Sequence, residues 1–152
     1  MFRFWPILLG ALLFRLSLAA AEPALGPFAA VDAAPVKTSI YLGSVTLSAG
    51  RFLRQGETYL APYTAKVFPY FFLSEDGQIQ ITVPDANLRG LARGAACEFQ
   101  GTAIRSDGRR RPISGRVLPL TASTGKLKVR LIVNRTLTLV FNSTYRLAGS
   151  SQ

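Results

Sequence analysis

The sequence contains no histidine, a single cysteine and only eight acidic residues. Histidine is the most common general base in enzymes and the most common protein ligand of transition metals. Without it, neither a Ser-His-Asp nor a Cys-His catalytic arrangement can be assembled, and zinc sites that use histidine are excluded. The sequence therefore predicts a non-catalytic protein that needs no metal and no cofactor.

The lone cysteine, Cys97, cannot form a disulfide within the chain. A small domain held together by internal disulfides is therefore excluded. Cys97 alternates with Ala95, Phe99 and Gly101 along a predicted strand, which places all four on one face. We expect Cys97 to be a buried, unreactive side chain; a reactive or intermolecular thiol is the alternative.

Acidic residues are scarce, whereas basic residues are abundant: eight against 18, for a formal charge of +10. Three of the acidic residues, Glu75, Asp76 and Asp107, occupy predicted turns, and Asp85 stands at a predicted helix start. This placement disfavours a pair of catalytic carboxylates. The excess of positive charge points to partners that carry phosphate, carboxylate or sulfate groups.

The N-terminus has the pattern of an export signal. A charged start at Arg3 precedes the apolar run 7–14, and Ala19–Ala21 provides small residues at a plausible cleavage point. We expect a signal peptide over residues 1–21 and a periplasmic or secreted protein, of bacterial type. The apolar run is shorter than the ~20 residues of a membrane helix, so no transmembrane span is expected in the mature chain; Arg15 leaves an uncleaved amphipathic anchor as the alternative.

Beyond the signal, the pattern divides the chain into three parts. Residues 22–36 are rich in Ala and Pro and show no regular period, which predicts a flexible lead-in. Residues 37–147 are expected to form a single β domain, and 148–152 a disordered tail. Nothing in the sequence indicates an oligomeric state.

Two-residue alternation of apolar and polar side chains dominates the β domain, most clearly in 78–83, 126–133 and 136–147. Turns are predicted at Asp76–Gly77, Asp107–Gly108, Thr124–Gly125 and Asn134–Arg135. The fold class is therefore all-β: an antiparallel meander of about seven to nine strands forming a small barrel, with a two-sheet sandwich as the alternative. The strands are expected near 39–47, 51–54, 58–61, 64–73, 78–83, 96–105, 112–120, 126–133 and 136–147.

One short helical turn is expected near residues 85–93, within the segment Pro84–Gly94. Asp85 is a candidate N-cap, and Leu88 and Leu91 share one face. Gly94 follows the segment as a natural end. Such a turn could close the end of a barrel or cover a sheet edge.

A run of three arginines, Arg109 to Arg111, follows the predicted turn at Asp107–Gly108. The sequence predicts that Arg109, Arg110 and Arg111 are solvent-exposed at a hairpin tip, with Pro112 marking a sheet edge. The tip could bind anions, or it could only protect the edge from aggregation.

A second group of cations lies on the polar face of the two following strands. If these strands pair, Arg116, Lys128 and Arg130 share one exposed surface and complete a six-residue candidate anion-binding set with the three arginines. An anionic polysaccharide or a lipid head group suits an exported protein. Nucleic acid is disfavoured, since export separates the chain from it and no aromatic residues alternate with the cations as stacking platforms.

The segment 66–74 is the most aromatic part of the chain. Phe68, Tyr70 and Phe72 would lie on one face of a strand, with Tyr63 nearby. The residues are either buried under a neighbouring segment or form a surface for an apolar ligand or a partner. The function expected first is a non-catalytic envelope domain that binds an anionic group through its basic surface; a barrel for an apolar ligand and a purely structural or protein-docking domain are the alternatives.

Overall fold

The computed structural model describes residues 25–148. In this range the chain forms ten β-strands, one α-helix and two short 3-10 helices. Their bounds in chain order are η1 Gly26–Ala29, β1 Ala30–Ala33, β2 Val36–Ile40, β3 Gly43–Ala49, β4 Phe52–Gln55, β5 Thr58–Phe68, η2 Phe71–Leu73, β6 Glu75–Thr82, α1 Asp85–Ala92, β7 Cys97–Arg105, β8 Arg110–Pro119, β9 Thr124–Ile132 and β10 Thr138–Leu147.

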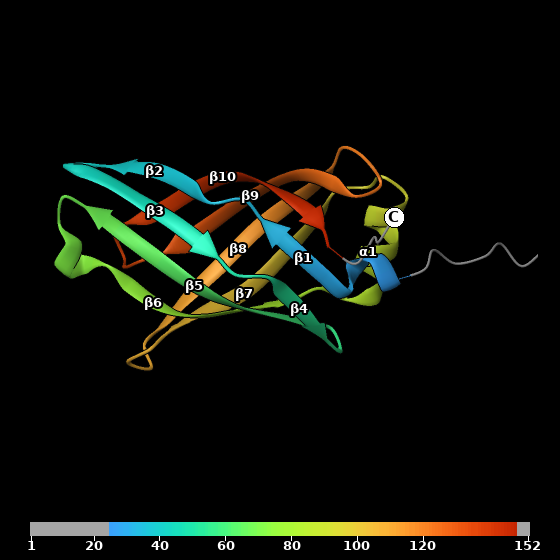
Figure 1. Ribbon diagram of the computed structural model, residues 1–152, viewed down its shortest axis with the longest axis horizontal. Coiled ribbons are helices and arrows are strands. Elements are labelled where there is room, and N and C mark those ends of the chain that lie inside the picture. Colours follow the sequence, from blue (N-terminus) through green and yellow to red (C-terminus); the bar gives the residue numbers. More distant parts are fainter. Residues whose placement is uncertain (1–24, 149–152) are drawn as a thin grey trace, which may run out of the picture.

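The strands form one antiparallel sheet that closes on itself as a barrel (Figure 1). β1 and β2 follow one another along one position of the wall, as do β3 and β4, so eight strands make up the circumference. Neighbours follow chain order, and β1 pairs with β10 to complete the ring. The predicted all-β barrel is thus confirmed, and the sandwich is not formed. Eight strands leave an interior that side chains can fill or that can hold one small ligand.

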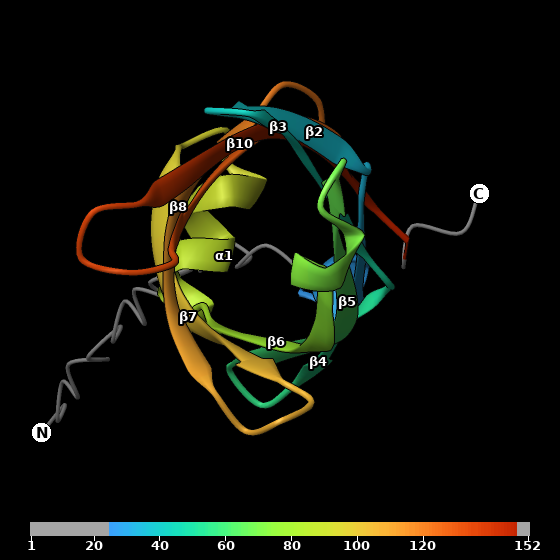
Figure 2. The same ribbon diagram turned by 90° about the vertical axis from the view of Figure 1, so that its left-hand side faces the viewer.

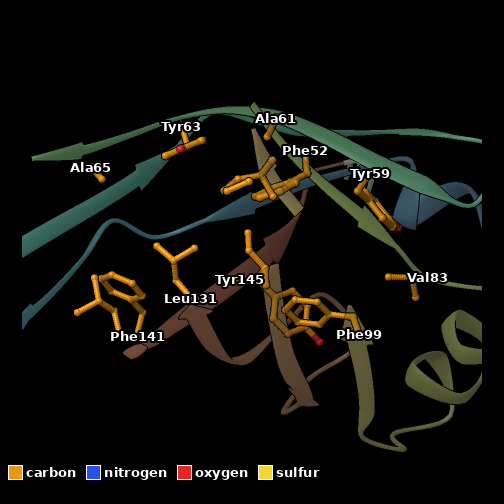
Figure 3. Close-up of a cluster of buried hydrophobic side chains, with 14 of the residues drawn as sticks. Phe52, Tyr59, Ala61, Tyr63, Ala65, Val83, Phe99, Leu131, Phe141 and Tyr145 are labelled. Atoms are coloured by element: carbon orange, nitrogen blue, oxygen red, sulfur yellow. The ribbon is translucent and has the colours of Figure 1, made fainter. Parts of the chain in front are cut away.

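Strict alternation along the strands builds the core. On β5 the side chains of Tyr59, Ala61, Tyr63, Ala65 and Val67 are buried, whereas those between them are partly or fully exposed. The same alternation on the other strands brings Phe52, Phe99, Phe141 and Tyr145 into the interior, as Figure 3 shows.

The two ends of the barrel differ. At the helix end, α1 and η1 cover the interior with the buried side chains of Leu88, Leu91 and Phe28. The hydroxyl of Tyr59 donates a hydrogen bond of 2.6 Å to the carbonyl oxygen of Phe28, which ties η1 to the barrel. The opposite end, called the loop end, consists of the four connections 41–42, 69–74, 106–109 and 133–137; Figure 2 looks into it, with α1 behind.

The predicted helix is confirmed, with one change at its start. Pro84 is the N-cap, and Asp85 is the first helical residue, without a side-chain capping hydrogen bond. Arg54 of β4 instead forms an ion pair with Asp85. The hydrogen bond from Arg54 lowers the pKa of the Asp85 carboxyl group and fixes α1 to the wall.

The prediction of a flexible lead-in is wrong for residues 25–36, because Ala30–Ala33 forms β1. Val31 pairs with Leu147 of β10 and with Phe52 of β4, and thereby joins the last strand to the rest of the sheet. The barrel therefore begins before residue 37. The predicted signal at 1–21 and most of the predicted tail at 148–152 lie outside the described residues.

Several predicted turns need correction, whereas the last hairpin is confirmed. Lys126–Ile132 pairs with Thr138–Thr144, as predicted. Asp107–Gly108 forms a turn, with Gly108 at φ 88°. Asp76–Gly77, however, belongs to β6 and Thr124–Gly125 to β9. At Gly77 a Cβ atom would lie 2.0 Å from the carbonyl oxygen of Ile104, so glycine is required there for close packing of two strands rather than for a turn.

Candidate functional site

Four cations lie side by side on the outer surface of β8 and β9, and we call them the basic wall: Arg116, Lys126, Lys128 and Arg130. Arg116 is the direct cross-strand partner of Lys128, and Arg130 is the partner of Ser114. All four side chains are exposed because the residues between them, such as Val117 and Val129, turn towards the interior. The structure thus brings Arg116, Lys128 and Arg130 together as predicted.

The positive charges of the basic wall are not neutralised by ion pairs in the part of the chain that the structure describes. Within residues 25–148, no carboxylate forms an ion pair with any of its four cations. Glu98 is the cross-strand partner of Arg116, yet the two do not form an ion pair. Like charges placed directly opposite one another on a sheet are destabilising, so this arrangement has a cost that a bound anion would offset.

Two open grooves flank the basic wall. One, of about 710 Å³, lies towards β10 and includes Lys126 and Asn142. The other, of about 730 Å³, lies towards β7 and includes Arg130 and Gln100. Arg116 and Lys128 line both grooves, so an extended ligand that crossed the wall would meet these two side chains from either side.

The arginine run does not form one exposed tip, which corrects the prediction for Arg111. Arg109 and Arg110 are exposed. Arg111 is paired across the sheet with the inward-facing Ala103, so its side chain enters the barrel and is only 16% exposed. The six predicted anion-binding residues therefore occupy three places: the loop end, the barrel interior and the basic wall.

Inside the loop end, Arg111 binds Glu75 through two hydrogen bonds. Its Nε and one terminal nitrogen lie 3.1 and 2.9 Å from the carboxylate oxygens, and its other terminal nitrogen donates to the carbonyl oxygen of Val133 at 2.8 Å. Tyr63 donates to the same carboxylate at 3.1 Å, and Arg105 approaches it at 3.5 Å. Burial first, and the neighbouring carboxylate second, raise the pKa of Tyr63. The network satisfies the charge of Arg111, so this arginine is structural.

The interior near the helix end contains small apolar voids. One, of about 90 Å³, lies beneath α1 and is bordered by Leu88, Tyr59 and Phe99, among others. A second, of about 60 Å³, lies further along the barrel and shares Phe99 with the first. Their lining is almost entirely apolar. A cavity of this kind stays dry and can accept a small apolar molecule, although ligand pockets are typically larger, ~300–1,000 Å³.

The four residues predicted to hold an apolar ligand do not share a face. Tyr63 points into the interior. β5 ends at Phe68, so the predicted strand 64–73 is interrupted, and Phe71–Leu73 forms η2. Phe68 and Phe72 are exposed, at 58% and 82%, and Tyr70 is partly buried against the core. The larger void is formed by other residues, and of these four only Tyr63 borders the smaller one.

Two features were not predicted from the sequence: the burial of Glu75 in an ion pair with Arg111, and the residues that line the larger void. Glu75 stands beside a turn-like Asp-Gly pair, which masked its place in β6. Its alternation with Gly77, Ile79 and Ile81 was the available signal. For Arg111, the corresponding signal was its two-residue spacing from the buried Ile113.

Catalytic and metal-binding candidates are few. Cys97 is a free thiol that borders the larger void, and burial raises its pKa, which disfavours the reactive thiolate. Among residues 25–148, no three His, Cys, Asp or Glu side chains are grouped so that they could hold a metal ion. In the same range no helix is both long and apolar enough to span a membrane.

Comparison with known proteins adds no relative: no family model matches the chain, and neither a curated protein nor a solved structure shows a significant match.

Proposed function

We propose that this protein is an exported, non-catalytic β-barrel that binds an anionic polymer of the cell envelope through the basic wall. The observation that carries the proposal is the direct opposition of Arg116 and Lys128, with Arg130 beside them and no ion pair to a carboxylate in the described chain. Arginine and lysine fit phosphate, carboxylate and sulfate groups well. Grooves on both sides of the wall suit an extended chain more than a compact ion.

Heparin provides a defined polyanion with which to test the proposal. The variant R116S/K128S/R130S should lose retention on immobilised heparin. The matched control K37S/K66S/R93S removes the same charge from exposed residues elsewhere on the molecule. Binding should weaken steeply with salt, because the Debye length falls from ~10 Å at 0.1 M to ~3 Å at 1 M. Equal losses in the two variants would mean that only net charge matters and would exclude a site at the basic wall.

Anionic vesicles form the second arm of this experiment. If the wall recognises lipid head groups rather than a polymer, the wall variant should lose vesicle binding while heparin competes poorly. If it recognises a polymer, the wall variant should lose retention on heparin but keep its binding to the vesicles. Either result assigns one source for the same anionic chemistry.

The interior void supports a second candidate function, the binding of a slim apolar molecule. The void beneath α1 is lined by aliphatic and aromatic side chains, with Tyr59 and Tyr145 among them. Xenon or benzene is the appropriate probe for a void of this size. Added benzene should raise the melting temperature of the wild type but not that of L127F, which fills the space between the two voids; no rise in the wild type would remove this candidate.

A further inference from the structure

The loop end carries a group of exposed aromatic and aliphatic side chains, which we call the aromatic rim. It is separate from the basic wall. Two connections of the loop end form the rim: the β2–β3 turn, Tyr41–Leu42, and the β5–β6 connection with the preceding Phe68. They lie side by side because β3 pairs with the end of β5, with Ser44 opposite Phe68. A Cβ atom on Gly43 would lie 1.9 Å from the carbonyl oxygen of Phe68, so the glycine permits this close approach. Figures 1 and 2 show both connections projecting at the end opposite α1.

Exposure at the rim is extensive. Half of the twelve large apolar side chains that are exposed within residues 25–148 belong to it. The six are Tyr41 at 99%, Leu42 at 63%, Phe68 at 58%, Phe71 at 63%, Phe72 at 82% and Leu73 at 56%. Single exposed apolar residues are ordinary, but a contiguous group marks a contact surface.

The rim side chains are held outward by an ordered backbone. The amide of Leu73 donates to the carbonyl oxygen of Tyr70 at 2.9 Å, and that of Ser74 to Phe71 at 3.0 Å. The hydroxyl oxygen of Ser74 accepts from the amide of Val67 at 2.9 Å and fastens the connection to β5. The rings of Phe68 and Phe71 meet edge to face at 5.7 Å. The rim is therefore a shaped surface.

The other two connections of the loop end add positive charge. Arg109 lies on the β7–β8 connection, Arg110 begins β8 beside it, and Arg135 lies on the β9–β10 connection; all three are exposed. Asp107 engages Arg109 at 3.7 Å, whereas neither Arg110 nor Arg135 forms an ion pair in the described chain. Asp76 also lies near this end, close to Ser106. Cations still outnumber carboxylates at the loop end. The carboxylates are Glu75, Asp76 and Asp107, and the cations are Arg105, Arg109, Arg110, Arg111 and Arg135.

We propose that the loop end docks on an anionic lipid bilayer, with the aromatic rim in the interfacial layer and the arginines on the lipid phosphates. Aromatic side chains are favoured at the membrane–water interface, and basic residues near an anionic leaflet strengthen binding. The arginines beside the apolar rim favour an anionic bilayer over a second copy of this chain, whose loop end would bring like charges together. This site is separate from the basic wall and from the interior void.

A single tryptophan can report the docking directly. The sequence has one tryptophan, Trp5, so F72W in a W5F background carries one indole, the rim indole. The matched control is L120W/W5F, which places its one indole, the control indole, on an exposed residue at the helix end. Vesicles of phosphatidylglycerol and phosphatidylcholine should shift the emission of the rim indole to the blue and allow quenching by brominated lipid. The control indole should show neither effect.

Two further variants separate the contributions. F71S/F72S should weaken co-sedimentation with these vesicles by at least ~10-fold, because two apolar side chains no longer insert. R110S/R135S should weaken it only on anionic vesicles and only at low salt. Both change exposed residues, and unchanged circular dichroism would show that the barrel is intact. R116S/K128S/R130S should leave the shift of the rim indole in place, so failure of the polymer proposal would be distinguishable from failure of this one.

Three outcomes would overturn the proposal. One is an emission of the rim indole that does not respond to anionic vesicles. Another is an equal response of the rim indole and the control indole. The third is a blue shift of the rim indole that grows with protein concentration in the absence of vesicles, which would assign the rim to self-association.

Discussion

At the helix end of the barrel, the interior is covered by apolar side chains from α1 and η1, and small voids remain beneath them. At the loop end, the interior is occupied by an ion pair between Glu75 and Arg111, and the apolar side chains are outside. The loop end thus inverts the usual distribution of polar and apolar groups, whereas the helix end keeps it. Stability at the helix end depends on apolar packing, whereas stability at the loop end depends on the buried ion pair between Arg111 and Glu75.

The largest effect is expected when the buried ion pair loses its carboxylate. Glu75 and Arg111 are only 10% and 16% exposed, so E75Q leaves a guanidinium in the interior without a counter-charge. Removing one partner of a buried pair costs about 3–5 kcal/mol, measurable as a shift of the urea midpoint. The double variant E75L/R111L should recover much of the loss, since an apolar pair can replace a buried ion pair. A loss below about 1 kcal/mol for E75Q would show that solvent already screens the pair.

A smaller effect is expected at the helix end. Leu88 is 2% exposed and borders the larger void, so L88A enlarges a space that already exists. Large-to-small changes in a core cost about 2–5 kcal/mol, and the higher values belong to sites that cannot collapse. α1 is short, and the ion pair of Arg54 with Asp85 holds only its first turn, so the rest of the helix can move partly into the gap. We expect about 2–3 kcal/mol by urea unfolding; a loss as large as that of E75Q would remove the contrast between the ends.

How much of the structure could be predicted depended on whether each strand is determined by its local sequence or by distant pairing. β9 and β10 were predictable because apolar and polar residues alternate along most of their length. β1 was not, because its alanines have low strand propensity and its pairing depends on β10, more than 100 residues away. Strand formation there is imposed by closure of the barrel.

The candidate site divides in the same way. The basic wall followed from alternation in two neighbouring strands, which is a local property. The burial of Arg111 depended on the registers of β6, β7 and β8, which bring Glu75 to it across the interior. The spacing of Arg111 from Ile113 was a local signal for an inward side chain, but only the fold shows the carboxylate that allows this arginine to be buried.

The alkaline limit of stability provides a third test, at the helix end. Burial raises the pKa of Tyr59 to about 12, against about 10 for an unfolded tyrosine. The folded state therefore favours the neutral phenol, so this contribution is fully present below pH 10 and is lost as the pH rises through 12. The loss should approach about 2 kcal/mol by pH 12, since one pKa unit corresponds to ~1.4 kcal/mol.

The variant Y59F isolates this contribution. It should cost about 1 kcal/mol at pH 7, because the hydrogen bond to the carbonyl oxygen of Phe28 is lost. It should also reduce the fall in stability between pH 10 and pH 12. The raised pKa of Tyr63 at the loop end will keep some dependence on pH, so a complete loss of that dependence in Y59F would contradict a shared origin.

The smallest effect is expected from the two exposed members of the arginine run. R109S/R110S should change the free energy of unfolding by no more than about 0.5 kcal/mol, because surface substitutions of exposed residues rarely exceed that value. The ion pair of Arg109 with Asp107 spans 3.7 Å at an exposed turn, and such pairs contribute little. R111S should instead destabilise the barrel by several kcal/mol, since it removes the hydrogen bonds to Glu75 and Val133. Urea unfolding of both variants compares neighbouring arginines inside and outside one wall. A similar loss of stability in both variants would mean that the tip is packed against the barrel. No loss in either variant would mean that the Glu75 network is open to water and that its ion pair does not stabilise the loop end.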